Sequence, residues 1–484
     1  MSIFTLAIYE DIASWKQEAK DEDNLRYFFP TPEAELLRSG QKAFLISRKG
    51  SGKTAIGQQI LKNRGPETFA TSLSFKHHPF NNLYARLRDS SFRRPNHFIS
   101  GWRFVIYCSI ARMMGEDPSV GWLNRRIIRR LFAQDVRLAL SSTIDRWIAG
   151  SANFRIWHFG LGARAARQFM NNELGLAERA DLLRTFVMAN ASRSKYYIVF
   201  DELDEDYTSS SDEKERAEYF ALLTSLLKAV NLVREEFKNA GANIFPIVLL
   251  RDDIFDKLED PDRSKWTDHA VMLSWTTDRI KEMLAFRLSR AANLEVPMNF
   301  SEIWGELVGK FPTFSTSKEW DKFDFIASYT LLRPRDFIFY LSDASKRIAQ
   351  KIKSGTANRT LTGTVLRECV RDFADHLKKE LVDEIGGQIP YINDVMEMIL
   401  RFEERHFSLA DFRSAYVNAA TNARDKPWTL SADSVLEQLY LFSVIGFVSG
   451  TREVFRYRNP NVDLDSSRKM LLHKGLLGAR RAVA

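Results

Sequence analysis

The segment Phe44–Thr54 constrains the fold of this chain more than any other stretch. An apolar run ends at Ser47, a loop rich in small residues follows, and a helical pattern begins near Lys53. Strand, small-residue loop and helix, in this order, are the context that a phosphate-binding loop requires. Gly50 and Gly52 let the backbone turn its N–H groups toward an anion, and the helix N-terminus adds positive character. The sequence therefore predicts a phosphate-binding loop at the end of a strand.

Individual residues of this loop have predictable roles. Lys53 can reach the β- and γ-phosphates of a nucleotide, and the Thr54 hydroxyl can ligate Mg²⁺. In the full pattern G-x-x-x-x-G-K-[ST] the first position is Gly, and here it is Ser47. An ordinary glycine-rich turn beside a surface lysine is the alternative interpretation. The residues predicted to contact the nucleotide are Arg48, Lys49, Gly50, Ser51, Gly52, Lys53, Thr54 and Ala55.

A second segment carries two carboxylates at the end of an apolar run. Residues 196–200 are apolar or aromatic, as in a fully buried strand, and Asp201 and Glu202 follow them. Ligands of open α/β sheets bind at the carboxyl ends of the strands. We expect Asp201 to hold Mg²⁺ and Glu202 to polarise the attacking water, with Asp204 a candidate for a second group beside the metal. An ordinary strand end is the alternative.

A third apolar run, residues 244–250, ends in Arg251. An arginine at this end of a strand can reach a γ-phosphate through a charge-assisted hydrogen bond. The alternative is an ion pair with Asp252 or Asp253.

This order of elements resembles the AAA+ and STAND branch of P-loop ATPases. The residues that carry the resemblance are Arg48–Thr54, Asp201–Asp204, Leu250–Phe255, Leu273-Ser274-Trp275 and Arg333-Pro334-Arg335-Asp336. The chain looks most similar to a bacterial group that ends in a winged helix and often sits in phage-defence loci. The resemblance implies that Arg251 is a sensor arginine. It also implies a lid helix that opens at Pro334, whose arginine reaches the nucleotide, with Arg335 the first choice and Arg333 the second. A helix-start arginine paired with Asp336 is the alternative.

The fold class expected is α/β, with a P-loop AAA+ parallel sheet, a helical insertion, a helical lid and a C-terminal winged helix. We place an N-terminal segment at 1–40, the core at 41–275 with its insertion at about 79–193, the lid at 276–386 and the winged helix at 387–484. The winged helix rests on helical patterns at 392–400, 409–420 and 434–442 and on two short strands, 445–448 and 454–458, with a closing helix at 471–479. Asp433 and Glu437 make its candidate recognition helix poorly suited to reading duplex DNA.

Composition restricts the remaining function classes. The net charge of +8 permits contact with nucleic acid without requiring it. The chain also has two arginine clusters, and three interpretations of them stay open. They could follow a phosphate backbone, one arginine could act across a subunit interface, or they could form a solvated face with salt bridges to acidic neighbours. The clusters are Arg86, Arg88, Arg93 and Arg94, and Arg125, Arg126, Arg129 and Arg130. The histidines show no metal-ligand spacing. No run predicts a membrane span or a signal peptide, so we expect a cytoplasmic protein with no membrane partner and two buried thiols.

These observations, together with the AAA+/STAND resemblance, which implies ATP and a lid, predict an ATP-binding and ATP-hydrolysing switch that uses Mg²⁺ and in which ATP closes the lid on the core. The resemblance suggests anti-phage defence, with a separately encoded protein effector or a homo-oligomer as partner. One alternative is a DNA-binding AAA+ loader or regulator that uses the winged helix and the basic insertion. Another is a scaffold that binds ATP without hydrolysing it.

Overall fold

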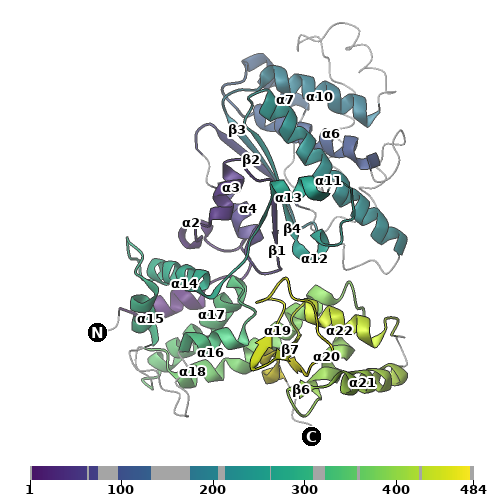
Figure 1. Ribbon diagram of the computed structural model, residues 1–484. Helices are drawn as coiled ribbons and strands as arrows, with labels where there is room; N and C mark the ends of the chain where they lie inside the picture. Colours follow the sequence, from purple (N-terminus) through teal and green to yellow (C-terminus); the bar gives the residue numbers. More distant parts are fainter. Residues whose placement is uncertain are drawn as a thin grey trace. The chain divides into compact units, whose positions relative to one another are not determined.

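The computed structural model describes residues 3–62, 65–74, 96–131, 175–204, 213–261, 263–308, 322–356, 360–423 and 428–479 of the 484. The first arginine cluster, residues 86–94, lies outside the described residues. The chain forms two compact units (Figure 1). The sheet unit comprises Pro30–Arg48 and Lys53–Leu273. The helical unit comprises Met1–Phe29, Lys49–Gly52 and Ser274–Ala484.

The sheet unit is built on a five-stranded parallel sheet in the order β2-β3-β4-β1-β5. Its strands are β1 Phe44–Ser47, β2 Thr68–Ser74, β3 Lys195–Asp201, β4 Ile244–Arg251 and β5 Ala270–Met272. Parallel strands need crossover connections, and helices supply most of them. The predicted α/β architecture with a parallel sheet is confirmed.

Strand order decides which side chains meet at the functional edge. Strand β4 lies between β1 and β3, so the strand that ends in Arg251 separates the loop strand from the carboxylate strand. The register pairs Ser47 with Arg251, and Phe200 with Val248. Because all strands run in the same direction, the loop, the carboxylates and Arg251 emerge at one edge of the sheet.

Helices cover both faces of this sheet (Figure 1). Helix α4 packs on the face that carries Val199 and Leu249, where Gly57 allows close approach: a Cβ there would lie 2.9 Å from Leu249 and 3.3 Å from Val199. On the other face Trp102 of α6 packs edge-on against Phe200. The helices of this unit are α3 Pro32–Arg38, α4 Lys53–Lys62, η1 Asn96–Phe98, α6 Ile99–Met114, α7 Trp122–Leu131, α10 Leu176–Asn190, α11 Glu213–Asn239, α12 Asp252–Phe255 and α13 Arg263–His269.

The helical unit contains the region for which we predicted a lid, and this region is helical. Its helices in this region are α14 Thr277–Ala291, α15 Phe300–Val308, α16 Lys322–Tyr329, α17 Pro334–Lys353, α18 Gly363–Glu368 and α19 Val370–Ile385, and the N-terminal helices α1 Leu6–Ala13 and α2 Asn24–Tyr27 belong to the same unit. Arg287 of α14 joins the two sets: its guanidinium pairs with Glu22 at 2.6 Å and lies over the rings of Trp15 and Tyr27.

The last part of the helical unit has the winged-helix elements: α20 Ile392–Leu400, α21 Leu409–Asn422, α22 Ala432–Leu441 and a sheet in the order β6-β9-β7-β8. Its strands are β6 His406–Phe407, β7 Ile445–Ser449, β8 Arg452–Val454 and β9 Met470–Leu472. The strand predicted at 454–458 was wrong in its bounds, because β8 ends at Val454 and residues 456–458 form a turn. The predicted closing helix at 471–479 was wrong at its start. Leu471 and Leu472 are fully buried between neighbouring strands, and only Lys474–Ala479 is helical, as the 3₁₀ turn η4.

Candidate functional site

The loop after β1 has the backbone that its glycines predict. Gly50 and Gly52 have φ of 79° and 98°, in the left-handed region that favours glycine. Ser47 does not share this geometry. It is the last residue of β1, it pairs with Arg251 across the sheet and it is 2% exposed. Extended backbone suits any residue, so the departure from the glycine motif at this position introduces no strain.

Lys53, the first residue of α4, folds back onto the loop. Its ammonium donates hydrogen bonds to the carbonyls of Ser47 and Arg48, at 2.9 and 3.0 Å. Burial lowers the pKa of Lys53, and Asp204 and Asp252 oppose that effect. The ammonium thus has carbonyl partners that it can exchange for the oxygens of an anion.

Thr54 and Asp201 bring the loop and the carboxylate strand together. The Thr54 hydroxyl donates to the Asp201 carboxylate at 3.5 Å, although the two residues are 147 positions apart. Asp201 is 7% exposed, and its carboxylate accepts a second hydrogen bond from the backbone N–H of Glu202 at 2.9 Å. The two predicted metal ligands therefore lie side by side in the sheet unit.

The backbone of Glu202 is unusual. Its φ is 57°, a left-handed conformation that costs a residue with a side chain on the order of 1 kcal/mol. The conformation occurs where β3 ends and the chain turns, with Leu203 buried directly after it. In proteins, residues with strained backbone conformations cluster at functional sites, where the surrounding structure holds them in place. No sequence pattern indicates this strain, because glutamate is not a residue expected there.

Arg251 is buried at the end of β4, where it is 2% exposed. Its guanidinium makes a two-pronged ion pair with Asp253, with both N···O distances at 2.8 Å, and it lies 3.5 Å from Asp204. The pairing alternative considered from sequence is therefore present in this structure. A sensor role for Arg251 stays a prediction. It would require the guanidinium to leave Asp253, or to bind a phosphate while it is still paired with Asp253.

The tip of the loop, Lys49–Gly52, packs within the helical unit. The backbone N–H of Arg335 donates to the Gly50 carbonyl at 3.4 Å, and the Trp275 indole N–H donates to the Ser51 carbonyl at 2.9 Å. A Cβ on Gly50 would lie 3.4 Å from the Arg333 side chain. The loop is therefore bound by the segment that leads into α14 and by the start of α17.

The two lid arginines are held by carboxylates. Arg333 is 1% exposed, donates to Asp336 at 2.9 Å and lies 3.5 Å from Glu384. Burial would lower the pKa of Arg333, but Asp336 and Glu384 raise it above its usual range. Arg335 pairs with Glu380 at 2.9 Å and with Glu18 at 3.1 Å. Both arginines lie beside the loop tip, and nucleotide contact by either one stays a prediction.

Trp275 is the site residue that sequence reasoning left without a role. It belongs to the Leu273-Ser274-Trp275 motif, but no pattern in the sequence says that its indole N–H reaches Ser51. In the structure it also packs against Phe29 and lies under the Arg279 guanidinium, 5.2 Å from the ring centre. These contacts hold the indole in place, so its N–H has a fixed direction.

The donor set fits Mg²⁺ and a polyphosphate. A hydroxyl and a carboxylate are the hard oxygen ligands that Mg²⁺ prefers, and this ion usually keeps several of its waters. Thr54 and Asp201 would hold the metal, and the loop N–H groups with Lys53 would hold the phosphates. Among the described residues no group of three or more His, Cys, Asp or Glu side chains is placed to hold a metal.

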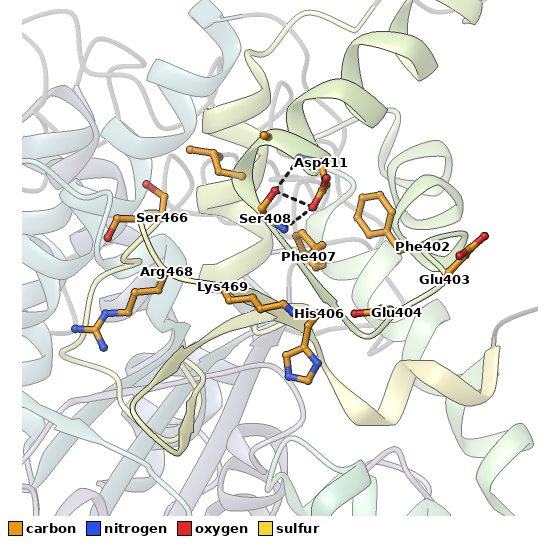
Figure 2. A pocket seen from close by; sticks show the side chains of 13 residues that line it. Phe402, Glu403, Glu404, His406, Phe407, Ser408, Asp411, Ser466, Arg468 and Lys469 are labelled. Atoms are coloured by element: carbon orange, nitrogen blue, oxygen red, sulfur yellow. Dashed lines mark hydrogen bonds between the residues drawn. The ribbon is translucent and has the colours of Figure 1, made fainter.

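A separate hollow of about 730 Å³ lies in the winged-helix part (Figure 2). Phe402 and Phe407 line it, together with Glu404, His406 and Lys469. Two of the polar residues that line this hollow, Ser408 and Asp411, hydrogen-bond each other at the N-cap of α21, as the dashed lines in Figure 2 show. These groups are therefore already paired within the protein. Charges of both signs line the hollow, and we assign it no ligand.

No protein-family model and no curated protein matches this sequence. Among solved structures, the chain is similar to the crystal structure of Cdc6p from Pyrobaculum aerophilum. The identity is 14% and the TM-score is 0.31, over 97% of this chain and 95% of that chain. A likeness of this size says nothing about what the present chain binds.

None of the helices in the described parts of the chain combines the length and the apolar character needed to cross a bilayer.

Proposed function

We propose that this chain is an ATP-binding and ATP-hydrolysing switch of the AAA+/STAND kind. The observation that carries the proposal is the hydrogen bond between Thr54 and Asp201. It joins a phosphate loop to the carboxylates of a distant strand, and a P-loop nucleotide site needs those two parts together.

Nucleotide binding would use groups that are already positioned. The phosphates bind the N–H groups of the loop, and Lys53 exchanges the carbonyls of Ser47 and Arg48 for phosphate oxygens. Bound Mg²⁺, held by Thr54 and Asp201, supplies charge neutralisation for the phosphates. ATP rather than GTP is the nucleotide that the resemblance implies.

Hydrolysis would depend on Glu202. A carboxylate directly after the metal-binding strand can accept a hydrogen bond from a water and orient it toward the γ-phosphate. The left-handed backbone of Glu202 supports this role, because it directs the residue away from the strand path that an extended residue would follow. Arg251 would stabilise charge on the phosphate once its pair with Asp253 is loosened.

The loop tip offers a route from the nucleotide to the helical unit. Gly50 and Ser51 are hydrogen-bonded to Arg335 and Trp275 within that unit. Phosphate bound to the N–H groups of the loop would therefore act on the same peptide segment whose carbonyls these two residues contact. Nucleotide state would thus bias the lid helices, which is how a switch reports its ligand.

The output of the switch would belong to a partner. A separately encoded effector protein or a homo-oligomer is the partner we propose, and anti-phage defence is the setting that the sequence resemblance suggests. Both follow from that resemblance and from the lack of a recognisable effector motif in the sequence.

Replacing Lys53 with Ala tests the nucleotide site. We expect loss of ATP binding in equilibrium dialysis with radiolabelled ATP and Mg²⁺. Lys62→Ala is the matched control, because Lys62 is exposed at the far end of the same helix. Tight ATP binding by the Lys53 variant would overturn the loop assignment.

A further inference from the structure

Helix α7, Trp122–Leu131, presents an unusual surface. Its sequence, WLNRRIIRRL, holds four arginines and no acidic residue. Trp122 at its start is 63% exposed and Leu123 is 49% exposed, whereas most tryptophans of soluble proteins are largely buried. An exposed indole beside a row of cations is not required by the ATPase site.

The other side of α7 is fixed to the protein. Ile128 is 1% exposed and packs against Gly115, where an added Cβ would lie 2.8 Å from the isoleucine. The Asn124 side chain donates to Asn190 of α10. Arg129 itself is exposed, and its Nε donates to the Gly115 carbonyl at 2.7 Å, which anchors this arginine to the protein. The helix is therefore a rigid support for its outer face.

That outer face combines one aromatic ring with two cations. Trp122, Arg126 and Arg129 are spaced i, i+4 and i+7, so they follow one side of the helix, and all three are exposed. In the described parts of the chain no carboxylate pairs with Arg125, Arg126 or Arg129. The alternative of a solvated face with salt bridges to acidic neighbours therefore has no support from the described residues around this helix.

We propose that the outer face of α7 binds single-stranded nucleic acid, with a base stacked on Trp122 and the backbone phosphates on Arg126 and Arg129. Proteins that bind single strands combine a basic track with aromatic rings, because every base offers a face for stacking. In a duplex the bases are already stacked and leave no face free for an exposed indole. This surface is separate from the nucleotide site and requires no hydrolysis.

A membrane surface is the less suitable partner. Amphipathic helices bind membranes by inserting their apolar side into the bilayer. In α7 the apolar residue Ile128 packs against Gly115 of the protein, and the exposed ring of Trp122 stands in line with the arginines. Among the side chains of α7 whose burial is described, Trp122 and Leu123 alone offer exposed apolar surface to a bilayer, whereas a ring in line with cations is the combination that single-stranded nucleic acid uses.

The test is fluorescence anisotropy of labelled oligodeoxythymidine with the full chain at about 50 mM salt, where phosphate contacts are strong. We expect Trp122→Ala to weaken binding about tenfold and Trp122→Phe to restore most of it, since a stacked base contributes roughly 1–3 kcal/mol. Arg126→Gln with Arg129→Gln should lower the slope of log K against log salt by about 1.4, at about 0.7 per phosphate on a single strand. Arg371→Gln and Leu232→Ala, which alter exposed residues on other helices, are the controls.

Several results would overturn the proposal: no binding at this salt, equal affinity for all variants, equal affinity for the duplex, or full competition by polyglutamate of the same charge. Loss of binding to phosphatidylserine vesicles in the same variants, without oligonucleotide binding, would overturn it in favour of a membrane. Lys53→Ala should leave oligonucleotide binding intact, and the α7 variants should leave ATP binding intact. The two proposals can therefore fail separately.

Discussion

The indole N–H of Trp275 donates a hydrogen bond to the carbonyl of Ser51 at 2.9 Å, and this links the phosphate loop to the segment that opens α14. Ser51 is 4% exposed, so its carbonyl has little access to water as a substitute partner. Losing such a bond leaves a buried acceptor unsatisfied and costs on the order of 1–3 kcal/mol. The bond therefore contributes to the conformation of the loop that we propose to bind phosphate.

Trp275→Phe keeps the ring and removes the donor. We expect ATP to bind about fivefold more weakly, because part of the binding free energy, about 1 kcal/mol, is then used to order the loop. Titration of the purified variant with a fluorescent ATP analogue measures the change. Trp304→Phe is the control: the Trp304 indole N–H has no partner among the described residues, so its removal should leave affinity unchanged. Equal affinities for all three proteins would exclude a role for the Trp275 bond.

Arg333 is a buried cation, and its replacement distinguishes a role in stability from a role in nucleotide binding. Arg333→Met removes an ionic partner of Asp336 and of Glu384, and breaking a buried pair from one side typically costs roughly 3–5 kcal/mol. We expect chemical denaturation to show a loss of stability of that size. The double variant Arg333→Met with Asp336→Asn should recover part of it. A stable single variant that binds ATP poorly would instead assign Arg333 to the nucleotide.

The lowered pKa of Lys53 leads us to expect that ATP affinity depends on pH. Burial lowers its pKa in the free protein below the ordinary value of 10.5, and bound phosphate should raise it again. The complex then holds more protons than the free protein at alkaline pH, so ATP binding takes up a proton and weakens as the pH rises through the lowered pKa. Calorimetry in buffers of different ionisation enthalpy measures this uptake. The absence of proton uptake across the alkaline range would contradict the pKa direction.

The sheet and the two ends of the site could be predicted from sequence because each has a local signal. Apolar runs that end in polar residues identify β1, β3 and β4, and glycine at positions 50 and 52 matches the left-handed backbone found there. Parallel pairing then requires that the strand ends meet at one edge. Thr54 and Asp201 came together for this reason, without any signal that linked them directly.

Side-chain partners could not be predicted in the same way. Arg251 had acidic neighbours at 252 and 253, and only the turn into α12 decides that Asp253 takes the guanidinium. The contact between Trp275 and Ser51 joins residues 224 positions apart and depends on tertiary packing. The left-handed backbone of Glu202 is likewise set by what surrounds the end of β3. Local propensity contains none of this information.

The most direct test of the central claim compares ATP turnover by the wild-type chain and by Glu202→Gln. Glutamine has nearly the same shape and tolerates the same backbone, but it accepts a proton from water far less well than a carboxylate. We predict that the variant binds ATP as tightly as the wild type while turnover falls by about a hundredfold or more, the usual size of a general-base effect. Glu259→Gln, at an exposed carboxylate of the same unit, should leave turnover unchanged. Unchanged turnover in Glu202→Gln would contradict the assigned role, and no turnover in the wild type would favour a scaffold that binds ATP without hydrolysing it.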